Sequence, residues 1–163
     1  MTDLKRWLIT NRIYASLFIL IGIFAYLDAM QIITFHTINT QQAWDLFNNF
    51  TGPAIWMTWY LSIVAIGIVY FWLTKDRSEA LGIVVAGLLL LWFAAEDVLF
   101  FLFSKQPMTQ CMQWFNDLNP QLTWWSTTIF KETCVSPQAL TSFAILGVII
   151  SYFTFNKLKK AKW

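Results

Sequence analysis

Two carboxyl side chains, Glu96 and Asp97, stand side by side in the otherwise apolar stretch LLLLWFAAEDVLFFLFSK, residues 88–105. An apolar medium and a neighbouring carboxyl group both favour the protonated form of an acid. Such a pair suits a general acid that keeps one proton near neutral pH, and in its ionised form it suits a bound cation. Glu96 and Asp97 are therefore the candidate catalytic residues.

A third acid and the single histidine belong to the first apolar stretch and the segment after it. Asp28 lies sixteen residues beyond Arg12, and Glu96 lies seventeen beyond Glu79. At about 1.5 Å per helical residue, both acids would lie roughly 25 Å from the same membrane edge. We expect His36 in the following loop, where it can fold back over this level. Asp28 and His36 are candidate ligand-binding residues, although acids near an interface are also tolerated without any function.

Aromatic side chains flank the acid pair. Trp92 and Phe93 precede it, and Phe100 and Phe101 follow it. Their rings could line a pocket for a long apolar or conjugated ligand and stabilise positive charge, although membrane helices carry aromatic residues near interfaces in any case. The sequence lacks metal-binding spacings such as HExxH or CxxC, so we predict no metal site, and it indicates no particular cofactor.

The composition shows which elements must position these residues. The chain of 163 residues is 58% hydrophobic and 12% charged, with 10 Trp and 15 Phe, which is typical of a membrane protein. Four apolar stretches approach the roughly 20 residues that cross a bilayer. We predict an all-α polytopic protein with a single domain, 1–163, and four transmembrane helices at about 7–30, 54–73, 80–103 and 139–155. The sequences around Asp76 with Glu79, and around Ser136 with Pro137, are typical of helix starts.

Basic residues predict the orientation. With the N terminus inside, nine of the eleven Lys and Arg residues fall on the cytoplasmic side, and only Lys105 and Lys131 fall outside. This asymmetry indicates cytoplasmic N and C termini, and four crossings return the chain to the same side. The basic residues thus reflect topology and not nucleic-acid binding. We expect an integral protein of a prokaryotic cytoplasmic membrane.

The outer segment between the third and fourth helices, residues 105–137, has its own pattern. Apolar residues recur at helical spacing from Met108 to Leu118 and again from Leu122 to Ile129, which predicts two short helices at the outer surface. They could cover the acids or simply pack at the interface. Cys111 and Cys134 both fall outside and could form a disulfide, with two reduced buried cysteines as the alternative.

The segment AEDVLFFLF, residues 95–103, resembles the acid-acid-apolar-apolar-Phe-Phe segment of the small membrane-embedded lycopene cyclases of bacteria and archaea, which form heterodimers. The resemblance implies that Glu96 and Asp97 protonate a polyene without redox change, with Phe100 and Phe101 beside it. This chain has Ala94 and Ala95 where a proline commonly precedes the acids in that family, and it lacks a second proline-linked acid pair.

Two functions remain open. The first is a membrane binding or assembly protein whose acidic outer-leaflet site takes a lipid, a cation or a partner subunit, the partners being membrane lipid, other membrane subunits or a second copy of the chain. The second is an intramembrane acid catalyst acting on an isoprenoid or carotenoid lipid. We rank binding first because the sequence contains no nucleophile–base pair, phosphate-binding loop or complete metal set.

Overall fold

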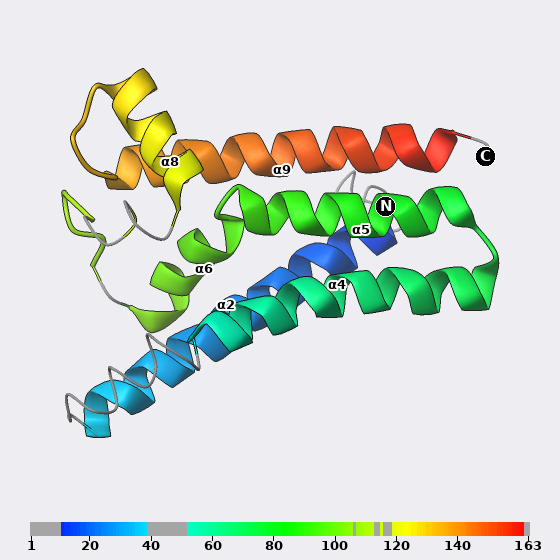
Figure 1. The fold of residues 1–163 in the computed structure, drawn as a ribbon, viewed down its shortest axis with the longest axis horizontal. Coiled ribbons are helices and arrows are strands. Elements are labelled where there is room, and N and C mark those ends of the chain that lie inside the picture. Colours follow the sequence, from blue (N-terminus) through cyan, green and yellow to red (C-terminus); the bar gives the residue numbers. More distant parts are fainter. Residues whose placement is uncertain (1–10, 39–51, 106, 113–114, 116–118, 162–163) are drawn as a thin grey trace, which may run out of the picture.

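The computed structural model describes residues 11–38, 52–105, 107–112, 115 and 119–161 (Figure 1). Its helices are α2 (Arg12–Ile38), α4 (Gly52–Thr74), α5 (Arg77–Trp92), α6 (Ala95–Ser104), α8 (Pro120–Trp125), the π-helical turn η2 (Ser126–Phe130) and α9 (Pro137–Lys160). Within these ranges there is no strand, only an isolated bridge between Met112 and Val135. The predicted all-α class is confirmed.

Three helices, α2, α4 and α9, are long and apolar enough to cross a membrane, and a fourth span results if α5 and α6 count as one bent span. The expected start of the first helix at residue 7 lies outside the described residues. Its end differs from the prediction: α2 continues past Met30 to Ile38, so the backbone of His36 is helical and not in a loop. The eight residues QIITFHTI contain no Gly or Pro to end the helix.

The third span is the main correction to the predicted helices. The single helix expected over 80–103 is broken between Trp92 and Ala95, and its halves α5 and α6 are bent by 61°. Ala94, fully buried, adopts a left-handed conformation with φ 58° and ψ 28°. Its N–H donates to the carbonyl of Leu91, which ends α5 in a tight turn. We call this break, Phe93 and Ala94, the elbow.

Helix packing brings the elbow against α9 and α6 against α2. Figure 1 shows α5 running between α4 and α9, while α6 turns away toward α2. Helix α5 contacts both α4 and α9, and helix α6 contacts α2. Gly147 of α9 lies against the elbow, where an added Cβ would be 2.1 Å from the Cβ of Phe93. The absent side chain at Gly147 therefore lets α9 approach the point where α5 ends.

One end of the bundle collects the start of α2, the α4–α5 turn and the end of α9 (Figure 1). Glu79 of α5 pairs with Lys159 of α9 at 2.7 Å and accepts a hydrogen bond from the Tyr70 hydroxyl of α4. Asp76 caps α5 by accepting from the Glu79 N–H at 2.9 Å, as predicted. These contacts join α4, α5 and α9 at this end.

The opposite end is closed by the segment between α6 and α9. Cys111 and Cys134 lie at disulfide distance with Cα atoms 5.5 Å apart, so the predicted pairing is confirmed. The Ser126 hydroxyl donates to the Cys134 carbonyl at 2.7 Å. The second predicted surface helix is present as α8 and η2. The first, expected from Met108 to Leu118, is not found over residues 108–112, where the chain is non-helical and Met112 instead bridges Val135. Residues 113–114 and 116–118 of that expected helix lie outside the described residues. This segment packs a buried cluster over α6 that includes Met112, Phe115 and Leu122.

Candidate functional site

The elbow makes Glu96 and Asp97 first-turn residues of α6. Negative side chains are favoured at this position because the exposed N–H groups of a helix start carry partial positive charge. Glu96 is only 7% exposed, and its Oε1 has no hydrogen-bond partner among the described residues. Asp97 is half-buried. A buried carboxylate oxygen without a partner is costly, which singles out Glu96 as a functional candidate.

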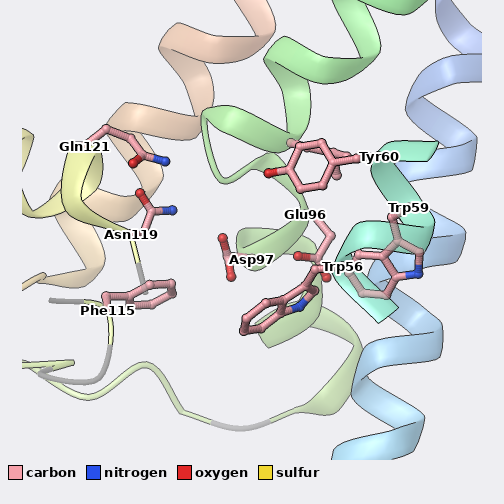
Figure 2. Close-up of a pocket in the computed structure, with 9 residues that line it drawn as sticks. Trp56, Trp59, Tyr60, Glu96, Asp97, Phe115, Asn119 and Gln121 are labelled. Carbon is pink, nitrogen blue, oxygen red and sulfur yellow. The ribbon is translucent and has the colours of Figure 1, made fainter. Parts of the chain in front are cut away.

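Both acids line a cavity of about 130 Å³ between α4, α6 and the segment around α8. Figure 2 shows the carboxylate of Asp97 near the centre of this space, with Glu96 closer to α4. The described residues that line it include no Lys, Arg or His: they are Trp56, Trp59, Tyr60, Leu91, Glu96, Asp97, Phe115, Asn119 and Gln121. The cavity, which we call the acid pocket, therefore carries carboxyl groups without a basic residue in its lining.

One wall of the acid pocket consists of aromatic rings from a single face of α4. Trp56, Trp59 and Tyr60 follow the i, i+3, i+4 spacing that places side chains together on a helix. Phe24 of α2 stacks on Trp59 with ring centroids 5.3 Å apart and planes within 4°. This stack covers one face of the Trp59 indole and holds the ring in place beside Glu96 (Figure 2).

The facing wall comes from the segment after α6. Phe115 contributes a ring, and the amides of Asn119 and Gln121 extend toward Asp97 (Figure 2). Asn119 caps α8 by accepting from the Leu122 N–H at 3.1 Å, and Gln121 Nε2 reaches the Trp92 carbonyl at 3.4 Å. The second contact connects α8 to the end of α5, where the elbow leaves a carbonyl without its helical partner.

The predicted third acid lies close by but outside the lining. Asp28 is 9% exposed on α2, the helix that packs against α6, and it interacts electrostatically with Glu96 and Asp97. Asp28 is thus on the helix next to the two pocket acids, but it is not among the residues that line the acid pocket. The side chain of His36 lies outside the described part of the chain.

The four predicted aromatic residues also lie outside the pocket lining. Trp92 is 52% exposed, and Phe93 packs on Phe143 with ring centroids 4.8 Å apart. Phe100 and Phe101 are buried and contact each other edge to face at 5.4 Å. The bend of 61° changes the direction of the chain between the two pairs, so a straight-helix projection misplaces them.

Sequence reasoning missed the aromatic wall and the facing wall. The spacing of Trp56, Trp59 and Tyr60 within WMTWY was a usable signal for one shared helix face, although it does not say what that face meets. Nothing local indicates that Phe115, Asn119 and Gln121 meet the acids, because that contact depends on the bend at the elbow.

The acid pocket offers few ligands for a metal ion. No group of three or more His, Cys, Asp or Glu side chains that could hold a metal ion occurs among the described residues. Glu96 and Asp97 supply carboxylate oxygens, and Tyr60, Asn119 and Gln121 add neutral polar atoms. The arrangement can accept positive charge, and a protonated Glu96 or Asp97 could also donate a proton to a ligand in the pocket.

Comparisons of the chain with protein-family models, with curated proteins and with solved structures find no match.

Proposed function

We propose that this chain is an integral membrane binding protein whose acid pocket holds a positively charged ligand. The observation that carries the proposal is the buried, unpartnered Oε1 of Glu96 beside Asp97, in a cavity whose described lining contains no basic residue. Uncompensated buried charge is costly, and a cation that enters the pocket would remove that cost.

The proposed location of the pocket is the outer leaflet. The basic-residue asymmetry favours a cytoplasmic position for the bundle end that contains the α4–α5 turn and the end of α9. The acid pocket lies toward the opposite end, beside the segment between α6 and α9. A ligand would then reach it from the outer surface or from the outer half of the bilayer.

An intramembrane acid catalyst is the alternative. The observation that favours it is the contact of the same two carboxyl groups with aromatic faces, which could stabilise a carbocation formed when an isoprenoid or carotenoid double bond takes a proton. This function agrees with the lycopene cyclase resemblance of AEDVLFFLF. A cavity of about 130 Å³ admits only one end of such a molecule, which is why binding of a small charged group ranks first.

The test uses Glu96→Gln and Asp97→Asn, which remove negative charge with little change of shape. The purified protein in detergent is heated at constant ionic strength with sodium, potassium, calcium, ammonium or choline chloride. At a concentration about 100-fold above Kd, a ligand that binds only the folded state stabilises it by about 2.7 kcal/mol. We expect at least one cation to raise the melting temperature of the wild type. The same cation should raise the melting temperature of both variants much less.

Glu132→Gln is the matched control, because Glu132 is an acid of the same outer segment that does not line the acid pocket. It should keep the wild-type response to the cation. The proposal is wrong if no cation stabilises the wild type, or if the response survives unchanged in both pocket variants. Conversion of a linear polyene to a cyclic isomer of equal mass, lost in Glu96→Gln, would favour the catalyst instead.

A further inference from the structure

We infer that the acid pocket is selective for an alkylated ammonium group, such as the trimethylammonium of choline, over a metal ion. This inference rests on the proposed function, that the pocket takes a cation, and it names the chemical class. The carboxylates of Glu96 and Asp97 would balance the charge, and the rings of Trp56, Trp59, Tyr60 and Phe115 would contact the alkyl groups.

The aromatic lining is the first argument. A cation over the face of Trp, Tyr or Phe is attracted by the electrons of the ring, and cages of such rings are the known protein solution for quaternary ammonium ligands. In the acid pocket, three rings come from one face of α4 and a fourth from the facing wall (Figure 2). Rings on two sides together with acids between them match an alkylated cation, whose charge is spread over apolar groups.

The shortage of oxygen ligands is the second argument. Calcium takes six to eight oxygen ligands, and magnesium requires near-octahedral geometry and gives up its water reluctantly. The described lining offers two carboxyl groups, one hydroxyl and two amides, and the amide oxygen of Asn119 already accepts a hydrogen bond from Leu122. A strongly hydrated ion would lose its water without replacing it, whereas an alkylated ammonium ion has little water to lose.

The size of the pocket is the third argument. Its volume of about 130 Å³ is well below the roughly 300–1,000 Å³ typical of pockets that enclose a whole drug-sized ligand. The pocket therefore takes a headgroup or a small free ion, and anything larger must remain partly outside. Choline free in solution and the choline headgroup of a lipid share this chemistry, and the experiment separates the two sources.

The experiment measures the Kd of tetramethylammonium and choline by titration calorimetry on the purified, full-length protein, with sodium and calcium as competitors. Removing one ring of the cage should weaken binding by about 2- to 30-fold, because a cation–π contact contributes about 0.5–2 kcal/mol. Trp56→Leu and Tyr60→Leu are the test variants, since both side chains are incompletely buried and tolerate replacement better than the core residue Trp59.

Trp72→Leu is the matched control, because Trp72 lies on the same helix, is 66% exposed and does not line the pocket. It should bind tetramethylammonium as the wild type does. Binding of sodium or calcium in preference to tetramethylammonium, dependent on Glu96, would overturn the selectivity while leaving the proposed function intact. Absence of all cation binding would overturn both. Equal weakening by Trp72→Leu and Trp56→Leu would also contradict the aromatic cage.

The source of the ammonium group is tested in lipid nanodiscs. If the lipid headgroup is the ligand, wild-type protein released from phosphatidylcholine nanodiscs should retain bound phosphatidylcholine in native mass spectrometry. The Trp56→Leu variant should not retain this lipid. With phosphatidylglycerol nanodiscs, free choline should still bind in either case. Choline binding that is equally strong in both discs, with no retained phosphatidylcholine, would assign the site to the free ion.

Discussion

At the scale of single residues, the acid pocket depends on the conformation of Ala94. A left-handed conformation costs an L-residue other than Gly about 1–2 kcal/mol, and such strain persists where the surrounding structure enforces it, often at functional sites. The turn at Ala94 ends α5 and starts α6 one residue before Glu96. The two acids thus gain a helix start to stabilise them and a cavity to face, neither of which a straight helix would provide.

We predict that Ala94→Gly is less destabilising than Ala86→Gly by about 2 kcal/mol. Both substitutions remove one fully buried methyl group. Glycine relieves the left-handed strain at position 94, whereas in the interior of α5 at position 86 it costs about 1 kcal/mol of helix propensity. Unfolding titrations in mixed detergent micelles measure the difference. Equal losses in the two variants would mean that Ala94 is helical and that the elbow is absent.

At the scale of elements, the facing wall of the pocket is a short segment held at its two ends. The Met112 N–H donates to the Val135 carbonyl at 2.9 Å next to the Cys111–Cys134 pair. Ser126 donates to the Cys134 carbonyl, which connects α8 and η2 to the same point. The disulfide closes a loop of 23 residues that contains Phe115, Asn119 and Gln121. The positions of these three pocket residues should therefore depend on the constraint that the disulfide places on this loop.

We predict that reduction of this disulfide lowers the stability of the protein by about 3 kcal/mol, the chain-entropy value for a loop of this length. Cation binding should weaken as well, because the residues of the facing wall lose their constraint. Thermal unfolding and tetramethylammonium titration, each with and without a membrane-permeant reductant, provide the measurement. The double variant Cys111→Ser with Cys134→Ser is the control and should show no further response to reductant. An unchanged melting temperature of the reduced wild type would contradict the prediction.

At the scale of the whole molecule, the exterior of the bundle is apolar. Helix α4 has only 17% of its candidate span buried, and large side chains such as Leu61, Ile68 and Trp72 are exposed on it. Water would make such a surface prone to aggregation, whereas hydrocarbon accommodates it. The polar contacts of Glu79, Lys159 and Tyr70 lie at one end, and Lys157, Lys159 and Lys160 occupy the last turn of α9. These features fit a bundle that crosses a membrane.

We predict that both the α4–α5 turn and the C terminus face the cytoplasm. When the protein is expressed in bacteria, a green fluorescent protein fused after Trp163 should fluoresce, since it does not become fluorescent when it is exported unfolded across the cytoplasmic membrane. Alkaline phosphatase inserted after Thr109, an exposed residue between α6 and α8, should be active, because that enzyme folds outside the cytoplasmic membrane. Phosphatase inserted after Asp76 is the control and should be inactive. The reverse pattern of activities would place the acid pocket on the cytoplasmic side.

The fold class and most of the helix positions follow from composition and local pattern. Runs of about twenty apolar residues favour helices in hydrocarbon, because only intrahelical hydrogen bonds satisfy the backbone there. The N-cap residues Asp76 and Ser136 begin α5 and α9 as their motifs predict. Pairing of the two cysteines could be proposed because both fall on the same side of the predicted topology. The helix starts depend on residues close together in the sequence. The proposed cysteine pairing depends on the number of predicted membrane crossings between the two residues and the chain ends.

The acid pocket depends on contacts between distant residues. The elbow contains neither Gly nor Pro, so its bend arises from the fit of Phe93 against Gly147 and of α6 against α2. The bend separates Phe100 and Phe101 from the pocket and brings Asn119 and Gln121 to it. Sequence alone thus determined that carboxyl groups lie in an all-α chain whose apolar helices are long enough to cross a membrane, because hydrocarbon selects for helices. Tertiary packing alone decided which rings and amides surround those carboxyl groups, because no local preference encodes a bend that only neighbouring helices stabilise.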